Sequence, residues 1–347
     1  MIVELTNKLS LYQDLSYDEM NVIMDELLNG KISSQEAANF LRNLTDKGES
    51  DEELLAMLDK MQQYAIHINP KRPGRMIDVC GTGGDKMKTF NVSTTAAFVI
   101  NSVGGTVAKH GNRSVSGISG SADIFEYFGY DLNITPEKVT EIIEKCGIGF
   151  MFAQKFHPAM KNIAEARKIL GTRTAFNLLG PLSNPAGVRN QLVGVFSADY
   201  LERIILLLKV RGAENAMSVL SHDGLDELST TSKNQICHLK DGKINIKILN
   251  PQDFGLTKSN LSDIQVSSKE HAIKSFITVL KGTANKSMIE VTALNAAAGL
   301  IISGIADDFH DAIPMALDSI KSGKSYNAFR DFIHFCGNIE KIEEFEK

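Results

Sequence analysis

The first seventy residues repeat one arrangement of polar and apolar positions three times. In each repeat a serine is followed three residues later by a glutamate, and apolar side chains then recur at helical spacing. The pairs are Ser16 and Glu19, Ser33 and Glu36, and Ser50 and Glu53. Such a pair forms a capping box, in which the serine and the glutamate each accept a backbone N–H at the helix start. We therefore predict three short helices and a small all-α unit here.

The pattern changes after PKRPGR (70–75), where short apolar runs begin to alternate with helical segments. The predicted strands are 76–80, 105–111, 148–153, 191–196 and 216–222, and the predicted helices are 95–103, 135–146 and 197–212. Alternation of this kind is typical of a mainly parallel sheet flanked by helices. The expected fold class is α/β, with a small N-terminal helical domain over 1–72 and a larger α/β domain over 73–347.

Composition narrows the possible functions. The chain of 347 residues carries a net charge of −5, which disfavours binding to nucleic acid through a broad basic surface. Its four cysteines form no CxxC pair, so a zinc site or a disulfide framework is not expected. The most apolar run, 291–306, is too short to cross a membrane and is interpreted as a buried helix. The first residues lack a signal-peptide pattern, and we expect a cytoplasmic protein.

The loop after the first predicted strand is rich in glycine. It reads GTGGD over 81–85, and Asn91, Ser93 and Thr94 place small polar groups at the start of the next helix. Free N–H groups at a helix start favour an anion, and glycine lets the backbone approach it closely. The stretch does not contain the Walker motif G-x-x-x-x-G-K-[ST], and a tight structural turn is the simpler alternative. We predict a phosphate-binding loop.

Two more loops follow predicted strands. The stretch 109–123 combines Lys109, His110 and Arg113 with several small residues, and 221–229 holds three acids in five positions. A flexible basic loop and a solvated acidic turn are the simpler interpretations. Magnesium commonly lies between protein carboxylates and substrate phosphates. Together, the loops indicate a magnesium-bound polyphosphate.

Two later stretches carry further candidates. His157 stands before a helix that begins with proline, and Arg167 lies on that helix. Surface positions are the simpler interpretation of both. The uncharged stretch NLLGPLSNP (177–185) contains a glycine and two prolines, and we predict a hinge or a rigid loop that faces a ligand.

Five motifs in this order resemble the anthranilate phosphoribosyltransferase family: GTGGD…TFNVST, KHGNR…SGSAD, HPAMK, FNLLGPLSNP and DGLDE. The resemblance extends from about residue 5 to about residue 335. It implies a helical domain beside an α/β domain, a fold shared with pyrimidine nucleoside phosphorylases. It also implies that helices near 158–190 join the small domain, and that two copies form a homodimer through their helical domains.

The resemblance implies a role for individual residues. Those expected to bind 5-phosphoribosyl 1-diphosphate (PRPP) are Gly81, Gly84, Asp85, Thr89, Asn91, Ser93, Thr94, Lys109 and Ser121. Those expected to contact anthranilate are Gly81, His110, Asn112, His157, Arg167, Gly180 and Pro181. Asp226, Glu227 and Ser93 are expected to hold magnesium, as two ions. Two positions depart from the family's pattern, because Lys86 stands where glycine is common and Ile118 where lysine is common.

The implied reaction is magnesium-dependent displacement of diphosphate from PRPP by the amine of anthranilate, in tryptophan biosynthesis. Catalysis is expected from positioning and electrostatics, with no side chain acting as acid, base or nucleophile. Two alternatives stay open at this point: a pyrimidine nucleoside phosphorylase on the same fold, and a non-enzymatic relative that binds nucleic acid. The net charge and the acidic pair Asp226 and Glu227 count against the second. We expect no nucleic-acid or membrane partner.

Overall fold

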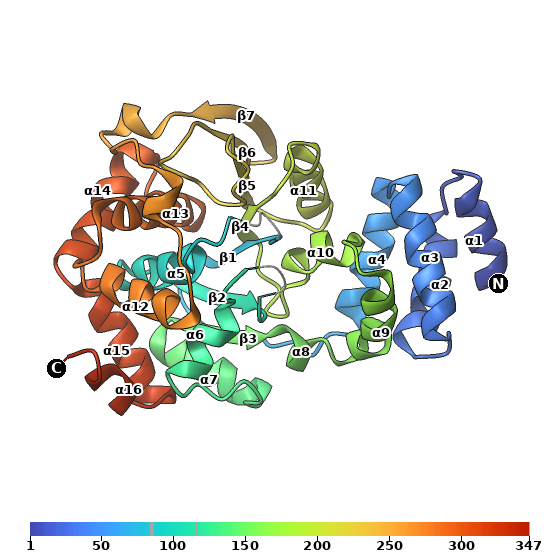
Figure 1. The fold of residues 1–347 in the computed structure, drawn as a ribbon, viewed down its shortest axis with the longest axis horizontal. Helices are drawn as coiled ribbons and strands as arrows, with labels where there is room; N and C mark the ends of the chain where they lie inside the picture. The colour runs from blue at the N-terminus through green and yellow to red at the C-terminus, as the bar shows by residue number, and fades with distance from the viewer. Residues whose placement is uncertain (84–86, 115–116, 347) are drawn as a thin grey trace. The chain divides into compact units, whose positions relative to one another are not determined.

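The computed structural model describes residues 1–83, 87–114 and 117–346, which form two compact units. The helical unit comprises Met1–His67 and Ala153–Pro185. The α/β unit comprises Ile68–Phe152 and Ala186–Lys347. Figure 1 follows the chain through both units by colour.

The helical unit begins with four helices: α1 (Ile2–Ser10), α2 (Tyr17–Leu28), α3 (Ser34–Lys47) and α4 (Asp51–Gln63). All three predicted capping boxes are present, at the starts of α2, α3 and α4. The prediction of three helices was nevertheless incomplete. Helix α1 begins at the chain start, and no side chain caps it, so it lacks the signal that marks the others.

The second segment of the helical unit holds α8 (Ala153–Phe156), α9 (Lys161–Leu170) and α10 (Ala175–Leu179). Helix α9 packs against α2 and α3. The Asn162 side chain supports this packing by donating to the Leu28 carbonyl at 2.6 Å. The prediction of a loop over 177–185 was wrong in part. Helix α10 and a short 3-10 turn at Pro181–Ser183 occupy most of that stretch.

The α/β unit is built on one seven-stranded sheet of order β3-β2-β1-β4-β5-β6-β7. The strands are β1 (Met76–Gly81), β2 (Thr106–Gly111), β3 (Ile148–Phe152), β4 (Asn190–Gly194), β5 (Asn215–Ser221), β6 (Asn234–Lys240) and β7 (Lys243–Leu249). β1 to β5 are parallel, as predicted, whereas β6 and β7 add an antiparallel hairpin at one edge.

The described part of the α/β unit contains nine helices: α5 (Val92–Ser102), α6 (Ser121–Tyr127), α7 (Pro136–Cys146), α11 (Asp199–Val210), α12 (Lys269–Leu280), α13 (Lys286–Ser303), α14 (Phe309–Lys321), α15 (Lys324–Cys336) and α16 (Glu340–Glu343). The predicted buried helix is α13, and it packs against β1, β4 and β5. The core beside α5 is aromatic, with Phe98 at 4.9 Å from Phe329 between ring centres.

The order of the sheet fixes where a ligand is expected. The crossover through α5 leads from β1 to β2, and the crossover through α11 leads from β4 to β5 in the opposite direction. Right-handed crossovers that run in opposite directions lie on opposite faces of a sheet. The strand order therefore reverses between β1 and β4. In open parallel sheets, ligands bind at the carboxyl ends of the strands at such a point.

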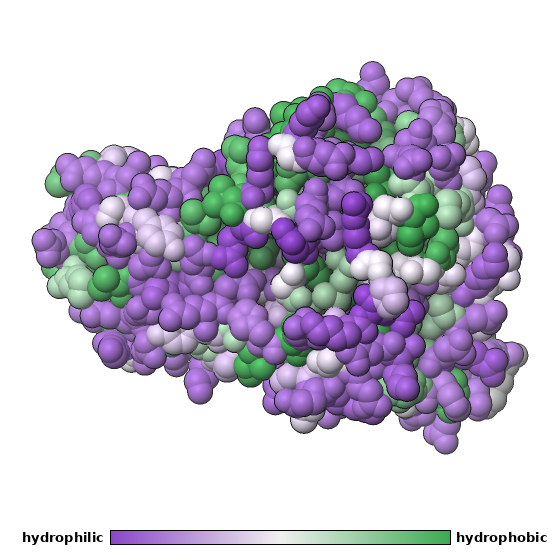
Figure 2. All heavy atoms as spheres, turned by 180° about the vertical axis from the view of Figure 1, so that it is seen from behind, coloured by the Kyte–Doolittle hydropathy of each residue, from purple (hydrophilic) through white to green (hydrophobic). Residues whose placement is uncertain are grey.

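Two further observations concern membrane-spanning helices and the polarity of the surface. Among the described residues, no helix is both long enough and apolar enough to cross a membrane. The face seen in Figure 2 is largely hydrophilic, with smaller apolar patches between the polar side chains.

Candidate active site

Two glycines end the strands at the reversal point. Gly81 closes β1 and Gly194 closes β4, and the Thr82 N–H donates to the Gly194 carbonyl at 2.9 Å. A Cβ atom at Gly194 would overlap the Asp226 carbonyl, and one at Gly81 would overlap the Asp226 carboxylate. Both glycines are therefore required for the close approach of the acidic loop to the strand ends.

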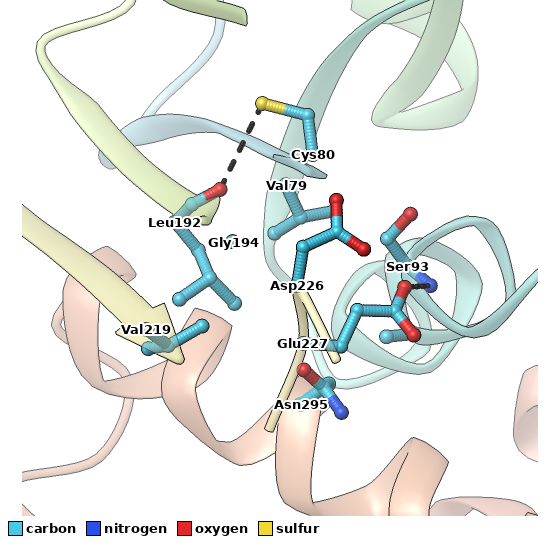
Figure 3. A pocket seen from close by; sticks show the side chains of 10 residues that line it. Val79, Cys80, Ser93, Leu192, Gly194, Val219, Asp226, Glu227 and Asn295 are labelled. Atoms are coloured by element: carbon cyan, nitrogen blue, oxygen red, sulfur yellow. Dashed lines mark hydrogen bonds between the residues drawn. The ribbon is translucent and has the colours of Figure 1, made fainter. Parts of the chain in front are cut away.

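The acidic loop follows β5 and brings two carboxylates to these strand ends. The Asp226 carboxylate accepts the Gly83 N–H at 2.6 Å, and the Glu227 carboxylate accepts the Ser93 N–H at 3.1 Å. Figure 3 shows both carboxylates beside Ser93, in the first turn of α5. The N–H groups expected to hold a phosphate thus hold the two acids in this structure.

Lys109 brings a cation to the same place. It lies on β2 with 2% of its surface exposed, and its ammonium donates to the Val79 carbonyl at 2.6 Å. The same ammonium lies 3.5 Å from the Ser93 hydroxyl. Burial lowers the pKa of Lys109, while the nearby Asp78 and Glu227 carboxylates oppose that effect. The site therefore combines a buried ammonium with two carboxylates at the start of a helix.

The other candidates between 89 and 94 surround the start of α5. The Asn91 side chain donates to the Ser119 carbonyl at 3.0 Å and so joins the first loop to the second. Thr94 is buried, and Thr89 forms an isolated bridge with Gln265. Gly84 and Asp85, also predicted to bind PRPP, lie outside the described residues.

The second loop begins at His110, whose N–H donates to the buried Asp78 carboxylate at 3.3 Å. The loop then folds back, and the Ser121 hydroxyl donates to the Asn112 carbonyl at 3.3 Å. Arg113 was expected to add positive charge for a ligand. Its guanidinium instead pairs with acids on α6, at 2.7 Å from the Glu126 carboxylate.

His157 and two of its predicted neighbours lie in the helical unit. The His157 ring is buried, and its Nε2 lies 3.5 Å from the Ser183 hydroxyl. That hydroxyl also donates to the Gly180 carbonyl at 2.8 Å, on the turn that Pro181 begins. Burial lowers the pKa of His157 to about 4, so the imidazole is neutral near pH 7.

Arg167 lies on α9 and is half-buried. Its guanidinium donates to the Asn177 side-chain oxygen at 3.3 Å and lies 5.8 Å from the centre of the Phe176 ring. The same Asn177 oxygen accepts the Thr174 N–H at 3.1 Å. Burial lowers the pKa of Arg167, but an arginine stays charged at physiological pH.

Comparison with known proteins decides the family. Residues 73–326 match the glycosyl transferase family, a/b domain, and residues 3–65 match its helical bundle domain. The chain is 59% identical to the anthranilate phosphoribosyltransferase of Nitrosopumilus maritimus, over 99% of each chain. The chain belongs to the anthranilate phosphoribosyltransferase family.

Other members of the family agree in sequence and structure. The anthranilate phosphoribosyltransferase of Cenarchaeum symbiosum is 45% identical over 97% of this chain and 98% of its own. The Thermus thermophilus enzyme superposes with a TM-score of 0.88 at 35% identity, covering 96% of this chain and 99% of its own. The Saccharomyces cerevisiae enzyme, solved in complex with PRPP and Mg, gives 0.86 at 26% identity, covering 96% and 97%.

In this member of the anthranilate phosphoribosyltransferase family, the candidate residues lie in both units of the chain. The α/β unit contains Gly81, Thr89, Asn91, Ser93, Thr94, Lys109, His110, Asn112, Ser121, Asp226 and Glu227. The helical unit contains His157, Arg167, Gly180 and Pro181. Within the α/β unit, direct contacts connect Ser93 with both Glu227 and Lys109.

The donor atoms in the α/β unit fit magnesium. Asp226, Glu227 and Ser93 line one small pocket and present oxygen atoms, which magnesium prefers. In the part of the chain that the structure describes, no group of three or more His, Cys, Asp or Glu side chains could hold a metal by itself. Magnesium is commonly bound by one or two protein carboxylates that share the ion with substrate phosphates.

Gly194 and Asn295 are absent from the residues predicted for the site, although both line the same pocket. Asn295 donates to and accepts from the backbone of Leu228, directly after the acidic pair. An asparagine inside the apolar run 291–306 was the available signal. The sequence signal for Gly194 was weaker. A glycine near the end of a predicted strand can mark a close approach of another backbone segment.

Proposed function

We propose that the chain transfers the phosphoribosyl group of PRPP to the amine of anthranilate, giving N-(5-phosphoribosyl)anthranilate and diphosphate. The observation that carries this proposal is the meeting of Asp226, Glu227, Ser93 and Lys109 where the strand order reverses. That arrangement belongs to a chain 59% identical to an anthranilate phosphoribosyltransferase. The α/β unit is proposed to bind PRPP and the helical unit to supply contacts to anthranilate.

On the donor side, the chain's own residues position PRPP and balance its charge. Asp226 and Glu227 would hold magnesium, with Ser93 beside them, and we propose two ions. Bound magnesium would stabilise the negative charge that develops on the departing diphosphate. Lys109 offers a buried ammonium for the same charge, and an ammonium shielded from water interacts more strongly with an anion than one in bulk solvent.

The glycine loop and the second loop are proposed to surround the donor. Gly81, Gly84, Asp85, Thr89, Asn91 and Thr94 would contact PRPP from the first loop, and Ser121 from the second. The hydrogen bond from Asn91 to Ser119 supports a shared role, because it fixes one loop against the other. Gly81 is also proposed to approach anthranilate.

On the acceptor side, Arg167 is proposed to bind the anthranilate carboxylate through a charge-assisted hydrogen bond. Its present partner, the neutral Asn177 oxygen at 3.3 Å, is a weak competitor for the guanidinium. His110, Asn112, His157, Gly180 and Pro181 would line the acceptor's path. The neutral His157 ring suits contact with an aromatic substrate and is not required to transfer a proton.

Catalysis is proposed to rest on positioning two substrates, which can supply roughly 7–11 kcal/mol of the barrier. The amine supplies the electron pair for the new bond at the anomeric carbon, and diphosphate leaves with the electrons of the broken bond. The nitrogen then loses one proton, which the released diphosphate or water accepts. No side chain is assigned as acid, base or nucleophile.

Two wider proposals accompany the reaction. The protein is proposed to be cytoplasmic, and two copies are proposed to form a homodimer through the helical unit. Exposed apolar side chains on and beside α1 support the second, with Val3, Leu11 and Tyr12 between 64% and 72% exposed. Light scattering coupled to gel filtration tests the dimer, and Leu11→Glu with Tyr12→Glu should shift the mass to that of a monomer.

The proposed reaction is tested by following anthranilate fluorescence after PRPP and magnesium are added. We expect a decay that requires the protein and PRPP and that stops when the metal is chelated. A constant signal together with tight PRPP binding would contradict anthranilate as the acceptor. A constant signal without PRPP binding would contradict the phosphoribosyl site itself.

A further inference from the structure

Asn295 makes an unusual pair of contacts next to the acidic pair. Its side-chain oxygen accepts the Leu228 N–H at 3.0 Å, and its side-chain nitrogen donates to the Leu228 carbonyl at 2.7 Å. The side chain comes from the middle of α13 and is 3% exposed. It therefore satisfies both backbone groups of the residue that follows Glu227, as a neighbouring strand would.

Helix α13, which carries Asn295, is itself held by several contacts. Helix α13 packs against β1, β4 and β5, and the Asn295 amide also donates to Val291 one turn earlier at 2.9 Å. At the end of β4, a Cβ atom at Gly194 would overlap the Asp226 carbonyl, so the loop also lies directly against this strand. The segment 226–228 thus contacts both the end of β4 and helix α13. A shift of Leu228 would carry Glu227 and Asp226 with it.

We propose that Asn295 is a positioning residue that places the Asp226 and Glu227 carboxylates for magnesium-bound PRPP. The inference rests on the proposed function and adds to it a residue from a helix that carries none of the predicted ligands. Asn295 acts through the backbone of Leu228, while Figure 3 shows its side chain beneath the two acids. Residues that orient a metal's ligands typically change metal affinity by 10- to 100-fold when they are replaced.

A second buried asparagine provides a matched control. Asn215 on β5 is 2% exposed and also ties the sheet to α13, because its side chain donates to the Ile301 carbonyl at 3.3 Å. Its side-chain oxygen contacts the His238 ring at 2.7 Å, so the partners of the Asn215 side chain lie on β6 and α13 and not in the segment 226–228. Asn215→Ala therefore removes packing and hydrogen bonds of the same kind as Asn295→Ala does. It leaves the contacts that hold Asp226 and Glu227 in place.

The experiment measures magnesium binding at saturating PRPP by isothermal titration calorimetry, with circular dichroism to confirm folding. Asn295→Ala removes both hydrogen bonds to Leu228 together with the one to Val291, and Asn295→Leu removes the same three while keeping most of the side-chain volume. We expect both variants to raise the apparent dissociation constant for magnesium at least tenfold, whereas Asn215→Ala stays within twofold of wild type. The leucine variant serves if the alanine variant does not fold.

The outcomes separate the inference from the function on which it depends. If the Asn295 variants bind magnesium within twofold of wild type, or if Asn215→Ala weakens binding equally, the positioning role is overturned. Recovery of wild-type affinity in Asn295→Leu alone would also overturn it, because the cavity and not the hydrogen bonds would then be responsible. Wild-type protein that binds no magnesium with PRPP would overturn the proposed function, and the inference with it.

Discussion

The two units hold their candidate residues in different ways. In the α/β unit, Asp226 and Lys109 are 7% and 2% exposed, and each is hydrogen-bonded to a backbone group at or just after the carboxyl end of the central strand β1. In the helical unit, Arg167 is half-buried and bonds to one neutral side chain at 3.3 Å. A backbone group in or next to a central strand has less freedom to move away than a side chain has. We therefore expect substitutions on the PRPP side to lower activity more than those on the anthranilate side.

The largest effect is expected from Asp226→Asn combined with Glu227→Gln. The change keeps the shapes but removes both negative charges that are proposed to hold magnesium. We expect kcat to fall about 1000-fold, equivalent to about 4 kcal/mol of transition-state stabilisation. The assay is anthranilate fluorescence at saturating magnesium. Glu290→Gln is the control, since Glu290 is 5% exposed but bonds to Thr257 away from the pocket. Unchanged turnover in the double variant would refute the metal assignment.

The next effect concerns the buried ammonium. Lys109→Met keeps the length of the side chain and removes its charge. We expect about a 100-fold loss of kcat/KM for PRPP, within the range for losing one preorganised electrostatic contact. Lys269→Met is the control on the same unit, because that lysine is 60% exposed and pairs with Asp123 at the surface. If the two variants lose activity equally, the buried position of Lys109 has no special role.

A smaller and more selective effect is expected on the other unit. Arg167→Ala should raise the KM for anthranilate roughly 10- to 100-fold, the worth of one charge-assisted hydrogen bond. The KM for PRPP should change less than twofold. Lys168→Ala, whose side chain is 79% exposed on the same helix, should behave as wild type. Equal losses for both substrates would contradict the division of roles between the units.

The smallest effect concerns one histidine in each unit, His157, which is buried, and His238, which is half-buried. Burial lowers the pKa of both His157 and His238 to about 4. The unfolded chain therefore takes up protons first, so stability falls as the pH drops from about 6.5 towards 4 and is unaffected above that window. By pH 5.5, each histidine is expected to lower the free energy of unfolding by about 1.4 kcal/mol.

Urea unfolding of His157→Gln and His238→Gln at pH 7 and pH 5.5 measures this effect. Each variant should show a smaller difference between the two pH values than wild type. If the helical unit unfolds separately, only His157→Gln should change its transition. An unchanged pH dependence in both variants would mean that neither ring is buried as a neutral group.

Local signals in the sequence predicted local structure well. The three predicted capping boxes were confirmed. Each depends only on a serine and a glutamate three residues apart, so the sequence alone is enough to predict it. The parallel strands were predicted for a similar reason, since each is one short apolar run. The hairpin of β6 and β7 was missed, although Asp241 and Gly242 between the strands are a typical hairpin turn.

Contacts between distant parts of the chain were beyond such signals. Asn295 and Leu228 are 67 positions apart, and no periodicity connects them. Lys109 reaches Val79 only because β1 and β2 are neighbours in the sheet. The candidate residues came from a resemblance of whole motifs. Their assignment to PRPP, anthranilate and magnesium therefore stays a prediction until the variants are measured.

The two-segment construction of the helical unit has a consequence for synthesis on the ribosome. Helices α2 and α3 pack against α9, whose residues are made only after β1, β2 and β3. At about 5–20 residues per second, more than a hundred intervening residues take roughly 5–20 s to translate. During that time the first four helices present an uncovered apolar face. The nascent chain is therefore expected to depend on a chaperone, or on slow collapse, before its first domain is complete.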